Sequence, residues 1–351
     1  MMFHRRSGTL DAELAAMNEC MPHYYRITQG HGQGAELLMN AEAAFMQGNF
    51  SDAQILLEQT YSTIASNGQH NISLCCDFLD ARLSLFQESV TFVKNPEVKR
   101  KELLSLHNMM WLNIFDSTYA YYYALIRMPE KIPALFKDHM LSTVSFLSPC
   151  RPMMEMIENQ VFLSQKMYAK VIGRSETLLP VCEKMHYELV SLHIQIQTAA
   201  AYAMLGKHHD ARQLLQKALG HAMPDGFLIP FVENYTYIKD VLGSINSITP
   251  EPFTDQILSL GSVYEQHCLR LSSRNYRPEI LNMLNSREAE ITALITDRLS
   301  NREIAERLFL SEGTVKQYVN QIYSKLMING DTRTKRKQLA ELISSINKSL
   351  T

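Results

Sequence analysis

The sequence predicts an all-α protein in which a long stack of helices precedes a smaller helical domain. From Ala35 to about Ser272, apolar residues recur at the i, i+3 and i+4 spacing of a buried helix face, and the Val-Ile-Thr alternation of strands is almost absent. Of the 351 residues, 46% are hydrophobic and 20% are charged, with only 14 Gly and 12 Pro. This composition is typical of a well-buried, largely helical protein, and the length predicts two or three domains.

Changes in composition divide the chain into an N-terminal segment (1–34), a helical stack (35–272), a linker (273–280) and a C-terminal domain (281–351). The linker is placed where the sequence becomes polar and reaches a proline. From Leu281 onward there are 11 Lys and Arg against 8 Asp and Glu, whereas the remainder has a net charge of -5. This asymmetry fits a small nucleic-acid-binding domain on a larger body that does not contact phosphate.

Two passages of the stack resemble each other and read AEAAFMQGNFSDAQILLEQT and AAAYAMLGKHHDARQLLQKA. In each, an Ala-rich helix ends at a glycine (Gly48, Gly206), and an alanine five residues later (Ala53, Ala211) begins the next helix. Gly ends a helix at low cost in a left-handed cap, and small Ala side chains let antiparallel helices approach closely. The passages resemble the helical hairpin of tetratricopeptide-like solenoids, repeated here with irregular spacing.

A solenoid of this kind is curved, and its concave face commonly binds a peptide or a small molecule. The sequence does not distinguish a small-molecule inducer from a protein partner, and a scaffold without a ligand is a third interpretation. Within the stack, the passage LGHAMPDGFLIPFVENYTYI contains two prolines among bulky apolar residues, which predicts a packed loop. A further helix is expected from Pro252 to about Ser272.

Three helices are predicted between Leu284 and Leu326 from their N-terminal caps. Asn285 has Glu288 three residues later and Ser300 has Glu303, which is the spacing of a capping box, and Ser311 caps the third helix. A tight turn is expected at 310–313. Each helix has one apolar stripe, formed by Ile291, Leu294 and Ile295, by Ile304, Ala305 and Leu308, and by Val315, Val319, Ile322 and Leu326.

The third helix is the one whose outer face indicates a function. Opposite its apolar stripe it has Lys316, Gln317, Asn320 and Ser324, which can exchange hydrogen bonds with base edges. A short second helix, a tight turn and a third helix with a polar face form the arrangement that reads the major groove of duplex DNA. Its first turn also offers backbone N–H groups that suit phosphate.

The same segment resembles the LuxR-type helix-turn-helix domain in four blocks, L-N-S-R-E, S-N-R-E-I-A, S-x-x-T-V-K and I-Y-S-K-L. The resemblance implies that the helix beginning near Glu312 is the recognition helix. It also implies two groups of DNA-binding residues, namely Lys316, Gln317 and Asn320 facing bases, and Thr314, Val315, Lys325 and Arg302 near the DNA backbone. Arg298, Tyr318 and Met327 depart from the family pattern, and Arg298 stands where a glycine is usual.

The segment after these helices is basic and then amphipathic. DTRTKRK, from Asp331, is interpreted either as a phosphate clamp or as a solvated loop. A fourth helix is expected from the apolar stripe of Leu339, Leu342, Ile343, Ile346 and Leu350. Similar domains often dimerise through this helix, so the resemblance implies a homodimer on adjacent half-sites.

The solenoid and the domain together resemble the carboxy-terminal part of MalT-like regulators, which combine an ATPase, an inducer-sensing superhelix and a LuxR-type tail. The passage PDGFLIPFVENY also resembles the end of their superhelix. The only Gly-rich piece, GHGQG, has no following Gly-Lys-Ser/Thr, so it is not a nucleotide-binding P-loop. The chain is therefore interpreted either as a shortened member or as a fragment of a longer protein.

No catalytic constellation is recognisable, so the sequence predicts a protein that is not an enzyme and uses no cofactor or metal. Cys20 with His23, and Cys182 with His186, have ligand-like spacing but no second pair nearby. His208-His209 is expected in a turn between helices. Reduced cysteines, no secretion signal and no membrane-spanning stretch predict a cytoplasmic location without a membrane partner.

An aromatic cluster has two interpretations. Trp111 and the nearby Tyr119, Tyr121, Tyr122 and Tyr123 are interpreted as core residues, with an aromatic ligand pocket as the alternative. For the whole chain two functions are considered. The first is a DNA-binding transcription regulator controlled by a ligand or partner on the solenoid, and the alternative is a protein-interaction adaptor whose tail serves assembly.

Overall fold

The computed structural model describes residues 4–65, 69–86, 96–144, 146, 148–275, 284–297, 299–326, 328, 330 and 334–339. These residues form helices and contain no β-strand, so the all-α prediction is confirmed. The α-helices are α1 (Leu10–Ile27), α2 (Ala35–Met46), α3 (Phe50–Ile64), α4 (His70–Leu83), α5 (Pro96–Ser105), α6 (Met109–Leu125), α7 (Ala134–Lys137), α8 (Arg151–Ser164), α9 (Tyr168–Met185), α10 (Glu188–Met204), α11 (His208–Ala222), α12 (Ile229–Val232), α13 (Tyr235–Ile248), α14 (Pro252–Asn275), α15 (Ser286–Thr296), α16 (Asn301–Leu308) and α17 (Glu312–Lys325).

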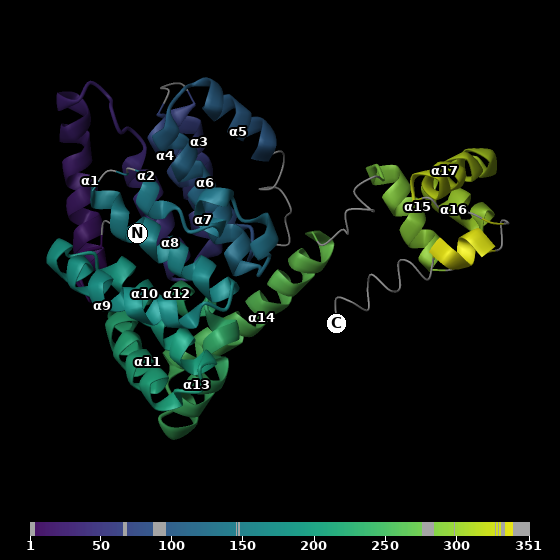
Figure 1. The fold of residues 1–351 in the computed structure, drawn as a ribbon. Coiled ribbons are helices and arrows are strands. Elements are labelled where there is room, and N and C mark those ends of the chain that lie inside the picture. Colours follow the sequence, from purple (N-terminus) through teal and green to yellow (C-terminus); the bar gives the residue numbers. More distant parts are fainter. Residues whose placement is uncertain are drawn as a thin grey trace. The chain divides into compact units, whose positions relative to one another are not determined.

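The chain forms two compact units, Met1–Leu269 and Arg270–Thr351, called unit 1 and unit 2 below (Figure 1). The N-terminal segment 1–34 lies in unit 1, where the buried Asp225 carboxylate accepts hydrogen bonds from the N–H groups of Gly8 (2.6 Å) and Leu10 (3.0 Å). Helix α14 extends three residues beyond Ser272, to Asn275. The rest of the predicted linker lies outside the described residues.

The two similar passages form helical hairpins as predicted. Helices α2 and α3 pack against each other, as do α10 and α11, and the glycines at the turns have φ values of 82° (Gly48) and 75° (Gly206). Ala53 and Ala211 are completely buried where the paired helices meet. The left-handed glycines and the small alanines therefore act as the sequence indicated. His208 is the first residue of α11, which corrects the predicted place of His208-His209 in the turn.

Successive hairpins stack into a solenoid. The first helices of the hairpins contact one another in order, α2 with α4, α4 with α6, α6 with α8 and α8 with α10. In Figure 1 the stack leads from α2 and α3 at the top of unit 1 to α11 and α13 at the bottom. These first helices, of which α6, α8 and α10 are buried around most of their circumference, form the inner side of the stack, which is called the concave side below. The tyrosines of α6 (Tyr119, Tyr121, Tyr122 and Tyr123) are buried, which supports their interpretation as core residues.

The solenoid closes on itself through the segment between α11 and α13. This segment contains a 3₁₀ turn (Met223–Asp225) and the short α12, so it is more regular than the predicted loop, and Phe227, Ile229 and Phe231 are buried. The N–H of Leu228 donates to the carbonyl oxygen of Met46 at the end of α2 (2.9 Å). The end of the stack therefore contacts its beginning, and part of the concave side becomes interior.

An ion pair spans this interior. The Arg82 guanidinium of α4 donates to both carboxylate oxygens of Glu233 (2.7 and 3.1 Å), and the Tyr121 hydroxyl of α6 donates to the same carboxylate (2.8 Å). Arg82 and Glu233 are 1% and 0% exposed. Burial alone would lower the pKa of Arg82, but the Glu233 carboxylate outweighs it and raises that pKa, so the guanidinium remains charged. The three side chains join α4, α6 and the end of α12.

No described helix is long and apolar enough to cross a membrane. No three or more His, Cys, Asp or Glu side chains in the described part of the chain are grouped so that they could hold a metal ion.

Candidate nucleic-acid interface

Unit 2 is built around the three predicted apolar stripes. Ile291 of α15, Ile304 of α16 and Val315, Val319 and Ile322 of α17 are all buried in one core. Leu294, Ile295, Ala305 and Leu326 are buried with them, and Leu308 packs against the same core. Because α17 contributes every third or fourth residue to this core, its opposite face must point outward.

The helix starts are fixed by the predicted caps. The Asn285 side chain accepts from the N–H of Glu288 (2.9 Å), and the Glu288 carboxylate accepts from the N–H of Asn285 (2.7 Å). Ser300 and Glu303 form a second reciprocal pair of this kind. The Ser311 hydroxyl accepts from the N–H of Thr314 (3.0 Å) at the start of α17. All three caps are confirmed, and α17 begins at Glu312 as expected.

The turn between α16 and α17 is short and strained. Phe309 has φ 54°, in the left-handed region that favours Gly or Asn, and its ring is 96% exposed. The N–H of Leu310 donates to the Ala305 carbonyl oxygen (2.9 Å), which closes the end of α16. From α15, Arg287 donates to the Leu308 carbonyl oxygen (2.7 Å). The sequence analysis did not identify Phe309 as the left-handed residue.

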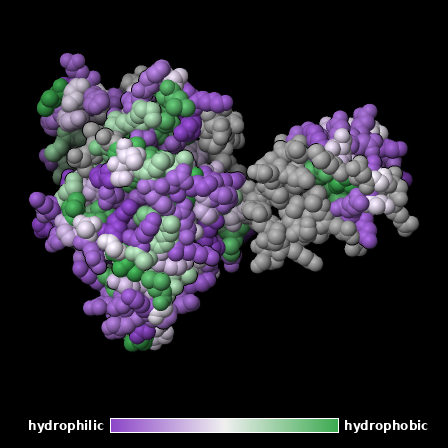
Figure 2. All heavy atoms as spheres, in the orientation of Figure 1, coloured by the Kyte–Doolittle hydropathy of each residue, from purple (hydrophilic) through white to green (hydrophobic). Residues whose placement is uncertain are grey.

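The outer face of α17 brings the predicted base-facing residues together. Lys316, Gln317 and Asn320 are exposed, and so is Ser324 one turn beyond Asn320. The surface over α17 is mainly hydrophilic in Figure 2. At 100° per residue, the directions of these four side chains fall within about a third of the helix circumference. We call Lys316, Gln317, Asn320 and Ser324 the outer face of α17.

Two further residues extend this face, and the sequence analysis missed both. Gly313 is exposed at the first turn, and a Cβ there would meet only the Ser311 hydroxyl, at 3.7 Å. Backbone can therefore approach a ligand closely at this end of the face. Gln321 is exposed at the other edge. A helical wheel drawn from Glu312 would have found both residues.

Among the residues predicted to lie near the DNA backbone, the prediction for Val315 must be corrected. Its side chain is completely buried in the unit 2 core, and its N–H donates to the Ser311 carbonyl oxygen (3.1 Å). Val315 therefore positions α17 and offers no group to a ligand. Thr314 is half-buried, and its hydroxyl is 2.8 Å from that of Ser311. It remains at the edge of the outer face.

The two predicted backbone-contacting cations are both in ion pairs. The Lys325 ammonium donates to the Glu288 carboxylate (2.7 Å), which is only 1% exposed, and Lys325 itself is 40% exposed. Burial would raise the pKa of Glu288, but the hydrogen bonds from Lys325 and from the Asn285 N–H outweigh it and lower that pKa. Lys325 therefore ties α17 to α15. Arg302 is 80% exposed and pairs with Glu306 within α16 (3.2 Å), so it remains accessible.

The basic run also contributes to the fold of unit 2, which neither of its two interpretations included. Residues 334–339 are helical. Arg336 donates to the Asn301 side chain (2.9 Å) and to the Leu299 carbonyl oxygen, and the Lys335 ammonium lies over the Tyr323 ring. These cations therefore attach the final helix to α16 and α17. Arg333 lies outside the described residues.

Other predictions about unit 2 fall partly outside the described residues. Two of the three departures from the family pattern, Arg298 and Met327, lie outside the described residues. The third, Tyr318, packs against the core. Leu339 of the last stripe is completely buried in that core. Leu342, Ile343, Ile346 and Leu350 lie outside the described residues.

Comparison with known families agrees with this geometry. Residues 282–336 match the family described as bacterial regulatory proteins of the luxR family. Unit 2 carries a LuxR-family domain. The match begins just before α15 and ends within the final helix, so it includes the three capped helices and the outer face of α17.

Similar proteins include three transcriptional regulatory proteins. The chain is 34% identical to LnrK of Bacillus subtilis (strain 168) over 110 residues, or 31% of this chain and 49% of LnrK. It is 45% identical to DegU of Brevibacillus brevis over 53 residues, or 15% of this chain and 22% of DegU. It is 36% identical to DesR of Bacillus subtilis (strain 168) over 75 residues, or 18% and 38%. The chain thus spans half or less of each relative.

Proposed function

We propose that the chain is a sequence-specific DNA-binding transcription regulator that reads duplex DNA through its LuxR-family domain. The observation that carries the proposal is the outer face of α17, where Lys316, Gln317 and Asn320 are exposed together while Val315 and Val319 anchor the opposite face. The three similar proteins are named transcriptional regulators, which supports the same class of function.

In this proposal α17 lies in the major groove. The Lys316 ammonium donates to guanine O6 and N7, and the Gln317 and Asn320 amides each pair with adenine through N6 and N7. Gly313 lets the first turn of α17 approach the duplex closely. Arg302 and Thr314 contact phosphates, which positions the domain without reading sequence. We leave Val315 and Lys325 out of the interface because one is buried and the other binds Glu288.

We further propose that unit 1 regulates this activity by binding a ligand or a partner, as the resemblance to MalT-like regulators suggests. Its closed solenoid is held by an ion pair between distant segments. In this proposal the solenoid has one arrangement with the pair formed and another with it broken, and a ligand selects between them. We also propose that two chains pair on adjacent half-sites, and that the chain acts by binding and not by catalysis. Its proposed location is the cytoplasm, where bacterial DNA is found.

A selection experiment with the full chain tests DNA binding. Duplexes enriched from a random library by the wild-type chain are used to measure the affinity of the double variant Lys316→Ala, Asn320→Ala. Because each base contact contributes about 1–3 kcal/mol, the loss of two contacts should lower the affinity by about 30-fold or more. The matched control, Lys101→Ala with Asn18→Ala on exposed positions of unit 1, should bind as the wild type does. Equal affinities for both double variants, or no enriched sequence, would contradict the proposal.

The salt dependence separates this function from the adaptor alternative. When binding neutralises phosphates, counterions are released. The logarithm of the affinity therefore falls linearly with the logarithm of the salt concentration. We expect a steep negative slope for the selected duplex, reduced by about one when Arg302 is replaced by Ala. An adaptor whose tail serves only assembly would show no such slope and no enriched sequence.

A further inference from the structure

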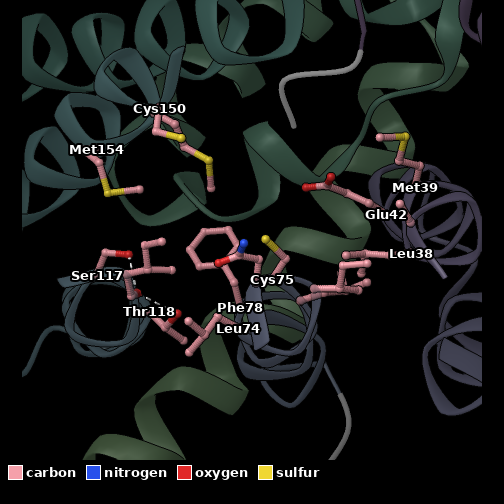
Figure 3. Close-up of a pocket in the computed structure, with 16 residues that line it drawn as sticks. Leu38, Met39, Glu42, Leu74, Cys75, Phe78, Ser117, Thr118, Cys150 and Met154 are labelled. Atoms are coloured by element: carbon pink, nitrogen blue, oxygen red, sulfur yellow. Dashed lines mark hydrogen bonds between the residues drawn. The ribbon is translucent and has the colours of Figure 1, made fainter. Parts of the chain in front are cut away.

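Unit 1 contains a cavity on the concave side of the solenoid, between α2, α4, α6 and the start of α8 (Figure 3). Its volume is about 300 Å³, at the lower end of the range of small-molecule sites. Leu38 of α2, Leu74 and Phe78 of α4 and Met154 of α8 form much of its wall. The cavity is separate from the exposed part of Trp111 and from the buried tyrosines that the sequence suggested as an alternative pocket.

The few polar side chains in the wall already have partners. The hydroxyls of Ser117 and Thr118 each donate to the Ile114 carbonyl oxygen (2.6 and 3.4 Å), and the Asn71 side-chain oxygen accepts from the Trp111 indole (2.7 Å). The Glu42 carboxylate, the only charged group among the described residues of the wall, lies 3.9 Å from Arg82. A charged or strongly polar molecule would lose its hydration here without gaining matching hydrogen bonds.

The remaining wall is soft and neutral. The Cys75 thiol points into the cavity, and Cys150 faces the same space (Figure 3). Burial raises the pKa of Cys75 to about 11 and also raises that of Cys150, so both remain uncharged thiols at neutral pH. Met39, Met153 and Met154 complete this part of the wall. Thioether side chains adapt to the shape of apolar ligands.

We propose that this cavity binds an uncharged, apolar small molecule of roughly ten to fifteen non-hydrogen atoms, since a water molecule's share of liquid volume is about 30 Å³. The inference rests on the proposed ligand control of unit 1 and specifies its chemistry. An apolar cavity of this kind gains contact and hydrophobic free energy when an apolar molecule fills it. Medium-length alkyl chains and small terpenoid or aromatic molecules have the required size and polarity.

The cavity lies directly against the ion pair that closes the solenoid. Phe78 lines the cavity, and its ring centre is 5.5 Å from the Arg82 guanidinium carbon and 5.5 Å from the Tyr121 ring centre. A ligand in contact with Phe78 therefore touches a side chain that packs on Arg82, whose guanidinium joins α4 to the end of α12.

Binding is tested first on the wild-type full chain with anthracene, a neutral apolar fluorophore whose size lies within the proposed range. Trp111 is the only tryptophan, and its indole bonds to Asn71 in the cavity wall. The fluorophore should bind saturably and quench Trp111 emission by energy transfer. Competition with 1-decanol should release it, whereas decanoate and decylammonium should compete at least tenfold less well. No saturable binding, or equal competition by the charged compounds, would overturn the proposal.

A variant then locates the site. Cys75→Phe places a large ring in the cavity and should weaken fluorophore binding at least tenfold, whereas Cys20→Phe adds the same ring at an exposed position of α1 and should not. Circular dichroism shows whether Cys75→Phe is folded, and if it is not, Trp111 quenching in the wild type decides alone. Undiminished binding to folded Cys75→Phe would overturn the assigned site. Because no DNA is present, failure here is distinct from failure of DNA binding.

Discussion

The two units of the protein differ in whether a central group of polar side chains is buried or exposed. In unit 1, Arg82, Glu233 and Tyr121 meet in the interior, and in unit 2 the polar side chains of α17 face outward over an apolar core. Buried charges are costly unless they are paired, whereas exposed polar groups keep their hydration and can exchange it for a ligand. The interior ion pair of unit 1 therefore holds its architecture together, whereas the outer face of α17 in unit 2 is available for binding.

The largest effect expected from this comparison is at Arg82. Replacing Arg82 by Met leaves Glu233 buried and unpaired, so the free energy of unfolding of unit 1 should fall by about 3–5 kcal/mol. Urea unfolding followed by circular dichroism measures this. The double variant Arg82→Met, Glu233→Met should recover much of the loss because no unpaired charge remains.

A half-exposed ion pair in the same unit is the control. Arg151 pairs with Glu155 one helical turn away, and Arg151→Met should cost only about 0–1 kcal/mol. If Arg82→Met costs no more than Arg151→Met, the interior pair does not hold the solenoid closed.

A smaller effect is expected at the hairpin glycines. Gly206→Ala should cost about 1–2 kcal/mol from the left-handed backbone alone, since no atom lies within 4 Å of the added Cβ. Gly48→Ala should cost more, because its Cβ would lie 3.3 Å from Leu228. Gly173→Ala, inside α9 and also in open space, should instead raise stability by about 0.5–1 kcal/mol. Equal effects at all three positions would refute the role given to the left-handed turns.

In unit 2 the corresponding ion pair is weaker because Lys325 is partly exposed. Replacing Glu288 by Gln should lower the free energy of unfolding of unit 2 by about 1 kcal/mol at pH 7, after allowance for solvent screening. The pKa of Glu288 is lower in the folded state, so this stabilisation is present above its ordinary value of 4.5 and is lost as the pH falls through the folded value.

Thermal unfolding of wild type and Glu288→Gln between pH 3 and 7 therefore should show a difference that narrows below about pH 4.5. Lys316→Met, on the outer face of α17, should change stability by less than about 0.5 kcal/mol at every pH. A difference between Glu288→Gln and wild type that stays constant down to pH 3 would show that the ion pair is not its cause.

The smallest effect is expected at the turn of unit 2. Phe309 is left-handed and almost fully exposed, so Phe309→Asn should raise the stability of unit 2 by about 0.5–1 kcal/mol. Phe309→Ala keeps the strain and should give no such gain. A loss of stability with both variants would show that the ring makes a stabilising contact.

Local features of the sequence predicted much of unit 2. Asn285, Ser300 and Ser311 were predicted as caps because a cap depends only on residues three positions away. The exposure of Lys316 and Asn320 was predicted because helical periodicity separates both residues from the buried stripe, and their contact with bases stays a prediction. The same periodicity places Val315 in the core, so the error there came from transferring family positions without regard to the burial of this residue.

Contacts between distant segments were not predictable. Arg82 and Glu233 are separated by 151 positions, and nothing near either residue marks the other as its partner. The hydrogen bond from Leu228 to Met46, which closes the solenoid, also joins segments that are far apart in the sequence. Similarly, the basic run looked like a solvent-exposed feature, whereas Arg336 reaches back to Asn301. Such partners are decided by tertiary packing, which the pattern of residues along the sequence does not reveal.

The most direct test of the central claim is the base preference of single variants of the LuxR-family domain at the selected duplex. If the outer face of α17 reads base edges, Asn320→Ala should remove the preference at one base pair and keep the others, with about a 1–3 kcal/mol loss on the preferred site. Arg302→Ala should weaken binding to all sequences about equally. If Asn320→Ala instead lowers affinity uniformly and leaves every preference intact, the outer face of α17 does not read sequence.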